Sequence, residues 1–169
     1  RLIPKFGTTL VFCRTRHGVD RVSRQMAEKG VGAGWIHGGR SQLQRDAALH
    51  AFTTGRVAAL VATDVAARGI HVDDVACVIH YDPPEDAKVY LHRSGRTARA
   101  GADGLVVTLV LPQNAVMMSR LQREIGVDHE LIQMRPNDPR LRDLTGWDPP
   151  TATYPAASGR YNMSPLRPG

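Results

Sequence analysis

Short apolar runs alternate with longer stretches of helical periodicity along this chain. Five runs are almost continuously apolar, as expected of parallel strands that are covered on both faces. They lie at residues 8–13, 35–36, 57–62, 76–79 and 105–111. Strands that alternate with helices indicate an α/β fold with right-handed crossovers and a mostly parallel sheet.

The helical stretches are expected to turn one face toward this sheet. After the first strand, Val19, Val22 and Met26 recur at helical spacing, and Gly30 ends the pattern. Ser41 and Gln44 have the spacing of a capping box that opens the next helix. That helix is expected to bury Leu43, Ala47, Ala51 and Phe52. A helix over residues 86–94 is expected to turn Ala87, Tyr90 and Leu91 toward the sheet. A final helix, whose first turn holds Pro112, carries the apolar residues Met117, Leu121 and Ile125.

The character of the chain changes after Arg135. Seven of the eleven prolines lie between residues 136 and 168, and helical periodicity disappears there. Proline removes backbone donors and fixes dihedral angles. We therefore expect a globular domain at residues 1–128 and a loosely ordered extension at 129–169.

Charge and cysteine usage narrow the class of protein only slightly. The net charge is +6, and only three of the 22 basic residues are lysines. Arginine suits phosphate contact, but a GC-rich genome would produce the same bias. Cys13 and Cys77 fall in predicted strands, which indicates buried thiols in a reducing, cytoplasmic protein without a metal site. No apolar run is long enough to span a membrane.

Three polar segments carry candidate phosphate chemistry. Residues 92–99 read His-Arg-Ser-Gly-Arg-Thr-Ala-Arg, and Arg96 and Arg99 are spaced to converge on one anionic group. Gln42 and Arg45 share a helix face near its N-terminus, where a phosphate can bind. Residues 62–70 end a strand and place Thr63 at its carboxyl end, where α/β sheets bind ligands. Taken singly, Thr63 would more often be a cap and Arg45 a solvated charge.

In this order the segments resemble the motifs of the second RecA-like lobe of DEAD-box RNA helicases. Residues 10–15 resemble motif IV, and His37-Gly38 with Gln42-x-x-Arg45 resembles the Q-x-x-R motif. Residues 62–70 resemble motif V, and residues 92–99 resemble motif VI, H-R-x-G-R-x-x-R. The resemblance covers roughly residues 8–126 and implies a RecA-like three-layer α/β/α fold.

The resemblance also implies the partners and the roles of individual residues. The cofactor would be ATP with Mg²⁺, held mainly by an N-terminal RecA-like lobe. Arg96 and Arg99 would be catalytic arginines at the ATP phosphates, with Arg99 the first choice for the arginine finger. Gly69 and His71 would line the nucleotide site with them. RNA-backbone contact is implied for Thr15, Arg16, Gly38, Gln42, Arg45 and Thr63. An inter-lobe or structural role is implied for Asp64, His92 and Arg93. For Arg93 alone the alternatives are a structural ion pair, with Asp64 as the candidate partner, and a contact with a ligand.

Two departures qualify these expectations. The family usually continues motif V as R-G-x-D, whereas this chain reads Arg68-Gly69-Ile70-His71. His71 lacks the charge of an aspartate near the ribose, and Asp73 or Asp74 would be the substitutes. The chain also contains neither G-x-x-x-x-G-K-[ST] nor Asp-Glu-Ala-Asp. Without a phosphate-cradling loop, the chain alone is not expected to hydrolyse ATP.

Two other functions have the same sequence features. One is a stand-alone module that binds RNA or protein without catalysis. The other is a lobe of a DNA-directed helicase of superfamily 2. The presence of both motif VI arginines argues weakly against the first, and the H-R-x-G-R-x-x-R form favours the RNA class over the second.

Overall fold

Five parallel strands form one sheet in the computed structural model, which describes residues 7–70, 72–97, 104–127, 129–135, 137–142 and 144. The strand order is β2-β3-β1-β4-β5, with β1 at the centre. The strands are β1 (Thr9–Phe12), β2 (Ala33–Ile36), β3 (Ala59–Ala62), β4 (Cys77–His80) and β5 (Leu105–Thr108). Each pair is parallel and in simple register, so that Phe12 lies between Ala62 and His80. The predicted parallel α/β fold is confirmed, although most of the strands are shorter than the apolar runs.

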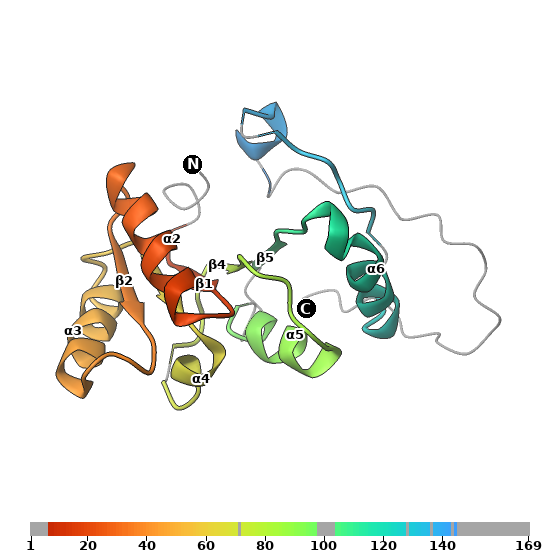
Figure 1. Ribbon diagram of the computed structural model, residues 1–169. Helices are drawn as coiled ribbons and strands as arrows, with labels where there is room; N and C mark the ends of the chain where they lie inside the picture. Colours follow the sequence, from red (N-terminus) through yellow and green to blue (C-terminus); the bar gives the residue numbers. More distant parts are fainter. Residues whose placement is uncertain are drawn as a thin grey trace.

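Helices cover both faces of the sheet. On one face lie α3 (Gln42–Thr53), the short α4 (Asp64–Ala67) and α5 (Ala87–Ser94), and on the other lies α2 (Arg16–Glu28) (Figure 1). A 3₁₀ turn at Pro112–Asn114 leads into α6 (Ala115–Glu124), which packs against α5, and a second 3₁₀ turn lies at Pro139–Arg142. Among the described residues, no helix is both long and apolar enough to span a membrane.

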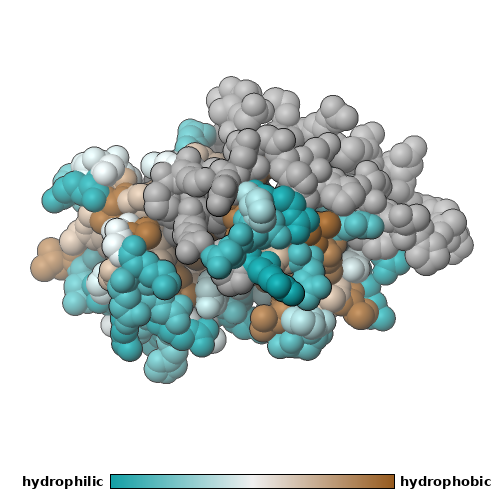
Figure 2. Space-filling model, turned by 90° about the horizontal axis from the view of Figure 1, so that it is seen from above, coloured by the Kyte–Doolittle hydropathy of each residue, from teal (hydrophilic) through white to brown (hydrophobic). Residues whose placement is uncertain are grey.

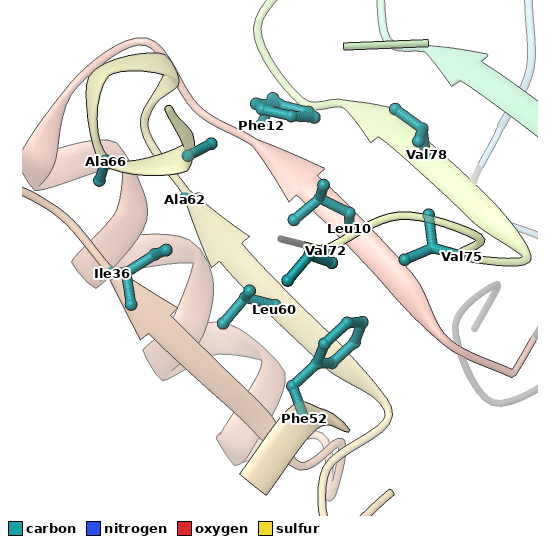
Figure 3. Close-up of a cluster of buried hydrophobic side chains, with 11 residues drawn as sticks. Leu10, Phe12, Ile36, Phe52, Leu60, Ala62, Ala66, Val72, Val75 and Val78 are labelled. Carbon is teal, nitrogen blue, oxygen red and sulfur yellow. The ribbon is translucent and has the colours of Figure 1, made fainter. Parts of the chain in front are cut away.

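Alternate residues of the central strands fill two hydrophobic clusters. Leu10 and Phe12 point to the face of α3 and α4, where Phe52 and Leu60 join them (Figure 3). Val11 points to the opposite face, toward α2. The central strands are therefore buried on both sides, which explains their continuous apolar runs. Seen from above, hydrophilic residues cover most of the described surface, with smaller hydrophobic areas between them (Figure 2).

The predicted inward face of α3 is only partly right. Phe52 is buried as expected, but Leu43 is 80% exposed, and the face that packs on the core passes through Arg45 and Ala48 as well as Phe52. The helix lies close against β2, since a methyl group at Gly34 would be 3.0 Å from the carbonyl oxygen of Ala48. Because the polar Arg45 lies on this inward face, the hydrophobic pattern of the sequence does not reveal the face.

The other helices agree better with the predicted pattern. Val19 and Val22 of α2 are buried, as are Leu121 and Ile125 at the end of α6. In α5 the prediction that Leu91 faces the sheet is wrong, because Leu91 is 44% exposed. The charged Arg93 is buried instead. The two cysteines are free and buried as expected, and burial raises the pKa of each thiol to about 12.

Candidate nucleic-acid interface

The six residues expected to contact RNA gather at the carboxyl edge of the sheet. Three neighbouring strands end there, and the chain then enters a loop or helix. After β1 come Thr15 and Arg16, after β2 comes Gly38, and after β3 comes Thr63; Gln42 and Arg45 lie in the first turns of α3. Because all strands run in the same direction, these residues lie at one edge.

Two threonine hydroxyls at this edge cap helices. Thr15 Oγ1 accepts a hydrogen bond from the Gly18 amide at 3.0 Å at the start of α2. Thr63 Oγ1 accepts from the Ala66 amide at 3.4 Å at the start of α4. A hydroxyl that accepts one hydrogen bond still has its own hydrogen to donate. Capping and donation to a phosphate oxygen are therefore compatible roles for both residues.

Gln42 and Arg45 share a face of α3, as their spacing predicts. Arg45 Nη1 donates to Gln42 Oε1 at 3.4 Å, and Arg45 Nη2 donates to the carbonyl oxygen of Ala66 at 3.4 Å. Gln42 Nε2 also donates to Asp46 Oδ1 at 2.7 Å. The bond to Ala66 connects the start of α3 to α4, and so holds Arg45 near the segment that begins with Thr63.

A glycine loop, residues 37–40, lies beside the start of α2. A methyl group at Gly38 would be 3.2 Å from Arg16 Nη2, so the guanidinium packs closely on this backbone. His37 precedes it and is buried, with its Nε2 3.1 Å from Asp20 Oδ1 and its Nδ1 accepting from the Gly39 amide at 3.1 Å. His37 was not among the predicted site residues. The signal in the sequence was its place beside Gly38 in the segment that resembles the Q-x-x-R motif.

The candidate ion pair between Arg93 and Asp64 is present and is bidentate. Arg93 Nε and Nη2 donate to the two carboxylate oxygens of Asp64, each at 2.7 Å. Arg93 Nη1 donates to the carbonyl oxygen of Asp82 at 2.8 Å, and the guanidinium lies 5.3 Å from the centre of the Phe12 ring. The Arg93 side chain is 3% exposed. It therefore joins the carboxyl ends of β3 and β4 from within the core.

Arg96 lies just after the C-terminal end of α5, away from the six residues at the carboxyl edge of the sheet. Its Nη1 is 3.0 Å from Asp73 Oδ1, in the segment that leads into β4, and its carbonyl oxygen accepts from the Val75 amide at 3.1 Å. About a quarter of each side chain in this ion pair is exposed. Arg96 is thus held by a carboxylate that a phosphate could replace.

Four expected site residues remain, of which Gly69 and His92 belong to the described part of the chain. Gly69 follows α4 with a φ of +79°, a conformation that favours glycine, and no atom of the described residues crowds the position of a side chain there. His92 is exposed on α5, and its predicted role at a lobe interface stays a prediction. His71 and Arg99 lie outside the described residues.

Comparison with known proteins gives one family match and many relatives. The family described as "Helicase conserved C-terminal domain" matches residues 2–101. A probable ATP-dependent RNA helicase, ddx17 of Dictyostelium discoideum, is 37% identical over 153 residues, which are 90% of this chain and 20% of that protein. DEAD-box ATP-dependent RNA helicase 30 of Arabidopsis thaliana is 46% identical over 106 residues, 63% of this chain and 18% of that protein. The chain thus spans about a fifth of the length of these relatives.

Solved structures of DEAD-box proteins share this fold. The DEAD-box protein SrmB of E. coli, solved in complex with the regulator of ribonuclease activity A, has a TM-score of 0.71 and 35% identity, over 91% of this chain and 84% of that one. The C-terminal domain of the DEAD-box protein Dbp5 has a TM-score of 0.67 and 29% identity, over 73% of each chain. In both, the similarity extends over most of the described fold.

Proposed function

The chain belongs to the helicase conserved C-terminal domain family, among the DEAD-box RNA helicases, and on this basis we propose that it is the C-terminal lobe of an ATP-dependent RNA helicase. In the full-length protein this RecA-like lobe would close with an N-terminal lobe around ATP and RNA. Closure would bend the bound strand and separate a short duplex, and hydrolysis would reopen the lobes.

The RNA side of the proposal is supported by the gathering of six residues at one edge of the sheet. Two hydroxyls, two arginines, one side-chain amide and an exposed glycine backbone converge there from three strands and α3. Each of these groups can donate a hydrogen bond to a phosphate oxygen. Contact with the backbone alone would make binding independent of RNA sequence and sensitive to salt.

The nucleotide side is supported by the position of Arg96. A backbone hydrogen bond to Val75 fixes its main chain, while its side chain forms a partly exposed ion pair with Asp73. This fits a guanidinium that exchanges the Asp73 carboxylate for a phosphate oxygen of ATP. When bound, ATP with Mg²⁺ supplies the transferable phosphoryl group, held mainly by the N-terminal lobe. Arg96 and Arg99 then stabilise negative charge at the phosphates as catalytic arginines.

The decisive experiment measures RNA-stimulated ATP hydrolysis by the full-length helicase. Arg96→Ala and Arg99→Ala should each lower kcat by about 10³-fold or more, the effect typical of arginine fingers. Nucleotide binding should be largely retained, since the arginines act at the transition state. Arg56→Ala, which removes an exposed arginine after α3, should leave turnover unchanged.

Normal turnover in the two variants would overturn the catalytic assignment. The isolated chain should show no detectable ATP hydrolysis with or without RNA, and robust turnover by a pure sample would contradict the half-site proposal.

Three finer expectations remain part of this proposal. His71 would contact the ribose in place of the usual aspartate, with altered affinity. Residues 129–169 would be an extension of the lobe rather than part of its core, and the protein would act in the cytoplasm.

A further inference from the structure

His37 uses both nitrogens of its ring within the fold. Nδ1 accepts a hydrogen bond from the Gly39 amide at 3.1 Å, so Nδ1 has no hydrogen of its own. The ring hydrogen of the neutral form must then be on Nε2, which lies 3.1 Å from Asp20 Oδ1. The side chain is only 9% exposed. The environment therefore selects one tautomer and one orientation of the ring.

The bond to Gly39 closes the glycine loop from inside. It runs from residue 37 to the amide two residues further on, as the side chain of an Asn or Asp does in an Asx turn. The backbone adds a second closure, since the Arg40 amide donates to the carbonyl oxygen of His37 at 3.0 Å. A methyl group at Gly39 would lie 3.1 Å from His37 Cε1, so the ring and the loop are in direct contact.

The same histidine connects this loop to α2. Asp20 lies in α2 one turn after Thr15 and Arg16, the two residues proposed to contact RNA at the start of that helix. Arg16 in turn packs on Gly38. The glycine loop is thus in contact with the His37 ring at Gly39 and with the Arg16 guanidinium at Gly38. At the far end of the loop, the Arg40 guanidinium stacks 4.6 Å from the centre of the Trp35 ring.

We propose that His37 is a positioning residue that fixes the glycine loop in the conformation that binds the RNA backbone. The proposal rests on the RNA-binding function proposed above. His37 is buried and offers no group to RNA, so it acts through Gly38 and through the alignment of the loop with Arg16. Removing the Nδ1 acceptor should loosen the loop and weaken RNA binding, although every group that contacts RNA remains.

The first test observes the tautomer of His37 in the 169-residue chain by ¹⁵N nuclear magnetic resonance. The expected spectrum has a protonated Nε2 and an unprotonated Nδ1 for His37 at neutral pH. A ring with hydrogen on Nδ1, or one that exchanges between both tautomers, would overturn the proposed hydrogen-bond arrangement.

The second test compares two substitutions at the same position. In His37→Asn the side-chain oxygen can accept from the Gly39 amide, whereas His37→Leu fills the space without an acceptor. Affinity for fluorescein-labelled decauridine should fall about three- to ten-fold in His37→Leu, the value of one hydrogen bond, and less than about two-fold in His37→Asn. Amide hydrogen exchange at Gly38 and Gly39 should accelerate only in His37→Leu. His50→Leu, at an exposed histidine near the end of α3, is the matched control and should bind as the original chain does.

The outcomes separate this inference from the function on which it rests. If the unsubstituted chain does not bind decauridine, the RNA-binding proposal fails, while the tautomer and the exchange rates still decide whether His37 fixes the loop. If the chain binds and both His37 variants bind equally well, or equally poorly, the positioning role is overturned. Should His37→Leu fail to fold, Gly39→Ala replaces it, because the added methyl group displaces the ring and should weaken RNA binding to the same extent.

Discussion

Arg93 and Arg96 lie three residues apart, and each pairs with an aspartate, but the two pairs differ in burial. The arginine side chains are 3% and 26% exposed, respectively, whereas the aspartate side chains are 31% and 27% exposed. Breaking a buried pair costs about 3–5 kcal/mol, and the lower end applies to Arg93→Gln, because the Asp64 carboxylate that it leaves unpaired is partly exposed. We therefore expect Arg93→Gln to lower the free energy of unfolding by about 3 kcal/mol, and Arg96→Gln to lower it by about 0–1 kcal/mol.

Urea denaturation of the isolated chain measures both values. Arg96→Gln is the internal control, because it makes the same chemical change on the same segment. Equal losses of stability in the two variants would show that Arg93 is not the buried structural arginine described above.

His80 makes the stability of the fold depend on pH. Burial, with a contribution from the nearby Arg93 charge, lowers the pKa of this histidine from 6.5 to about 3. Between pH 6.5 and about pH 3, His80 is therefore protonated in the unfolded chain but neutral in the folded chain. As the pH is lowered through this range, His80 alone should reduce the free energy of unfolding by about 1.4 kcal/mol for each pH unit.

His80→Phe isolates that contribution from the other titrating groups. The ring would occupy the space between Phe12 and Tyr90, where the imidazole makes edge contacts at 6.4 and 5.2 Å between ring centres. The variant should lose the hydrogen bond to Thr108 but show a shallower pH dependence than the original chain. Denaturation curves at several pH values measure the difference, and parallel curves would contradict a neutral, buried His80.

Individual site contacts were easiest to predict from the sequence where spacing along the chain determines the neighbours. Gln42 and Arg45 share a face because they are three residues apart in a helix. Asp64 was one of the alternatives offered for Arg93, but the Asp73 partner of Arg96 and the Asp20 partner of His37 were not predicted. These two contacts join residues from different elements, 23 and 17 positions apart, and depend on how the elements pack.

At the scale of elements, the capping box at the start of α3 stabilises the helix that presents Gln42 and Arg45. Ser41 Oγ accepts from the Gln44 amide, and Gln44 Oε1 accepts from the Ser41 amide. Ser41→Ala removes one of these bonds and should lower the free energy of unfolding by about 1 kcal/mol.

The matched control for this cap is Ser119→Ala in the interior of α6. Alanine is the better helix former there, so the control should be neutral or slightly stabilising. Thermal unfolding followed by circular dichroism measures both changes. A Ser41→Ala variant as stable as the original chain would exclude a contribution from the box.

Strands were easier to predict than helix faces. The five apolar runs lie within a few residues of the observed strands, because a parallel strand covered on both sides must be apolar throughout. The inward face of α3 could not be read in the same way, since Arg45 lies on it and uses its guanidinium to hydrogen-bond Ala66. The polar group is satisfied in the fold, but in the sequence it interrupts the hydrophobic pattern.

At the scale of the whole molecule, RNA binding should depend on arginines at only one edge of the sheet. Each phosphate contact to single-stranded RNA contributes about 0.7 to the slope of log K against log salt concentration. Arg16→Gln and Arg45→Gln should each reduce that slope by about 0.7. Arg56→Gln removes the same charge in the turn before β3, at the opposite edge, and should leave the slope unchanged.

Fluorescence anisotropy with decauridine over a range of salt concentrations measures the three slopes. Equal reductions in all three variants would indicate attraction by the net charge of +6 rather than by a defined edge.

The ion pair between Asp64 and Arg93 also restricts how this sequence can diverge. Loss of Asp64 alone leaves the buried Arg93 guanidinium without its carboxylate, and loss of Arg93 alone leaves Asp64 without its bidentate partner, so paths that change one position at a time pass through a less stable intermediate. Well-packed apolar residues at both positions would remove that cost, but they would be selected only together. Over evolutionary time positions 64 and 93 should therefore change as one unit or not at all, although 28 residues lie between them in the chain.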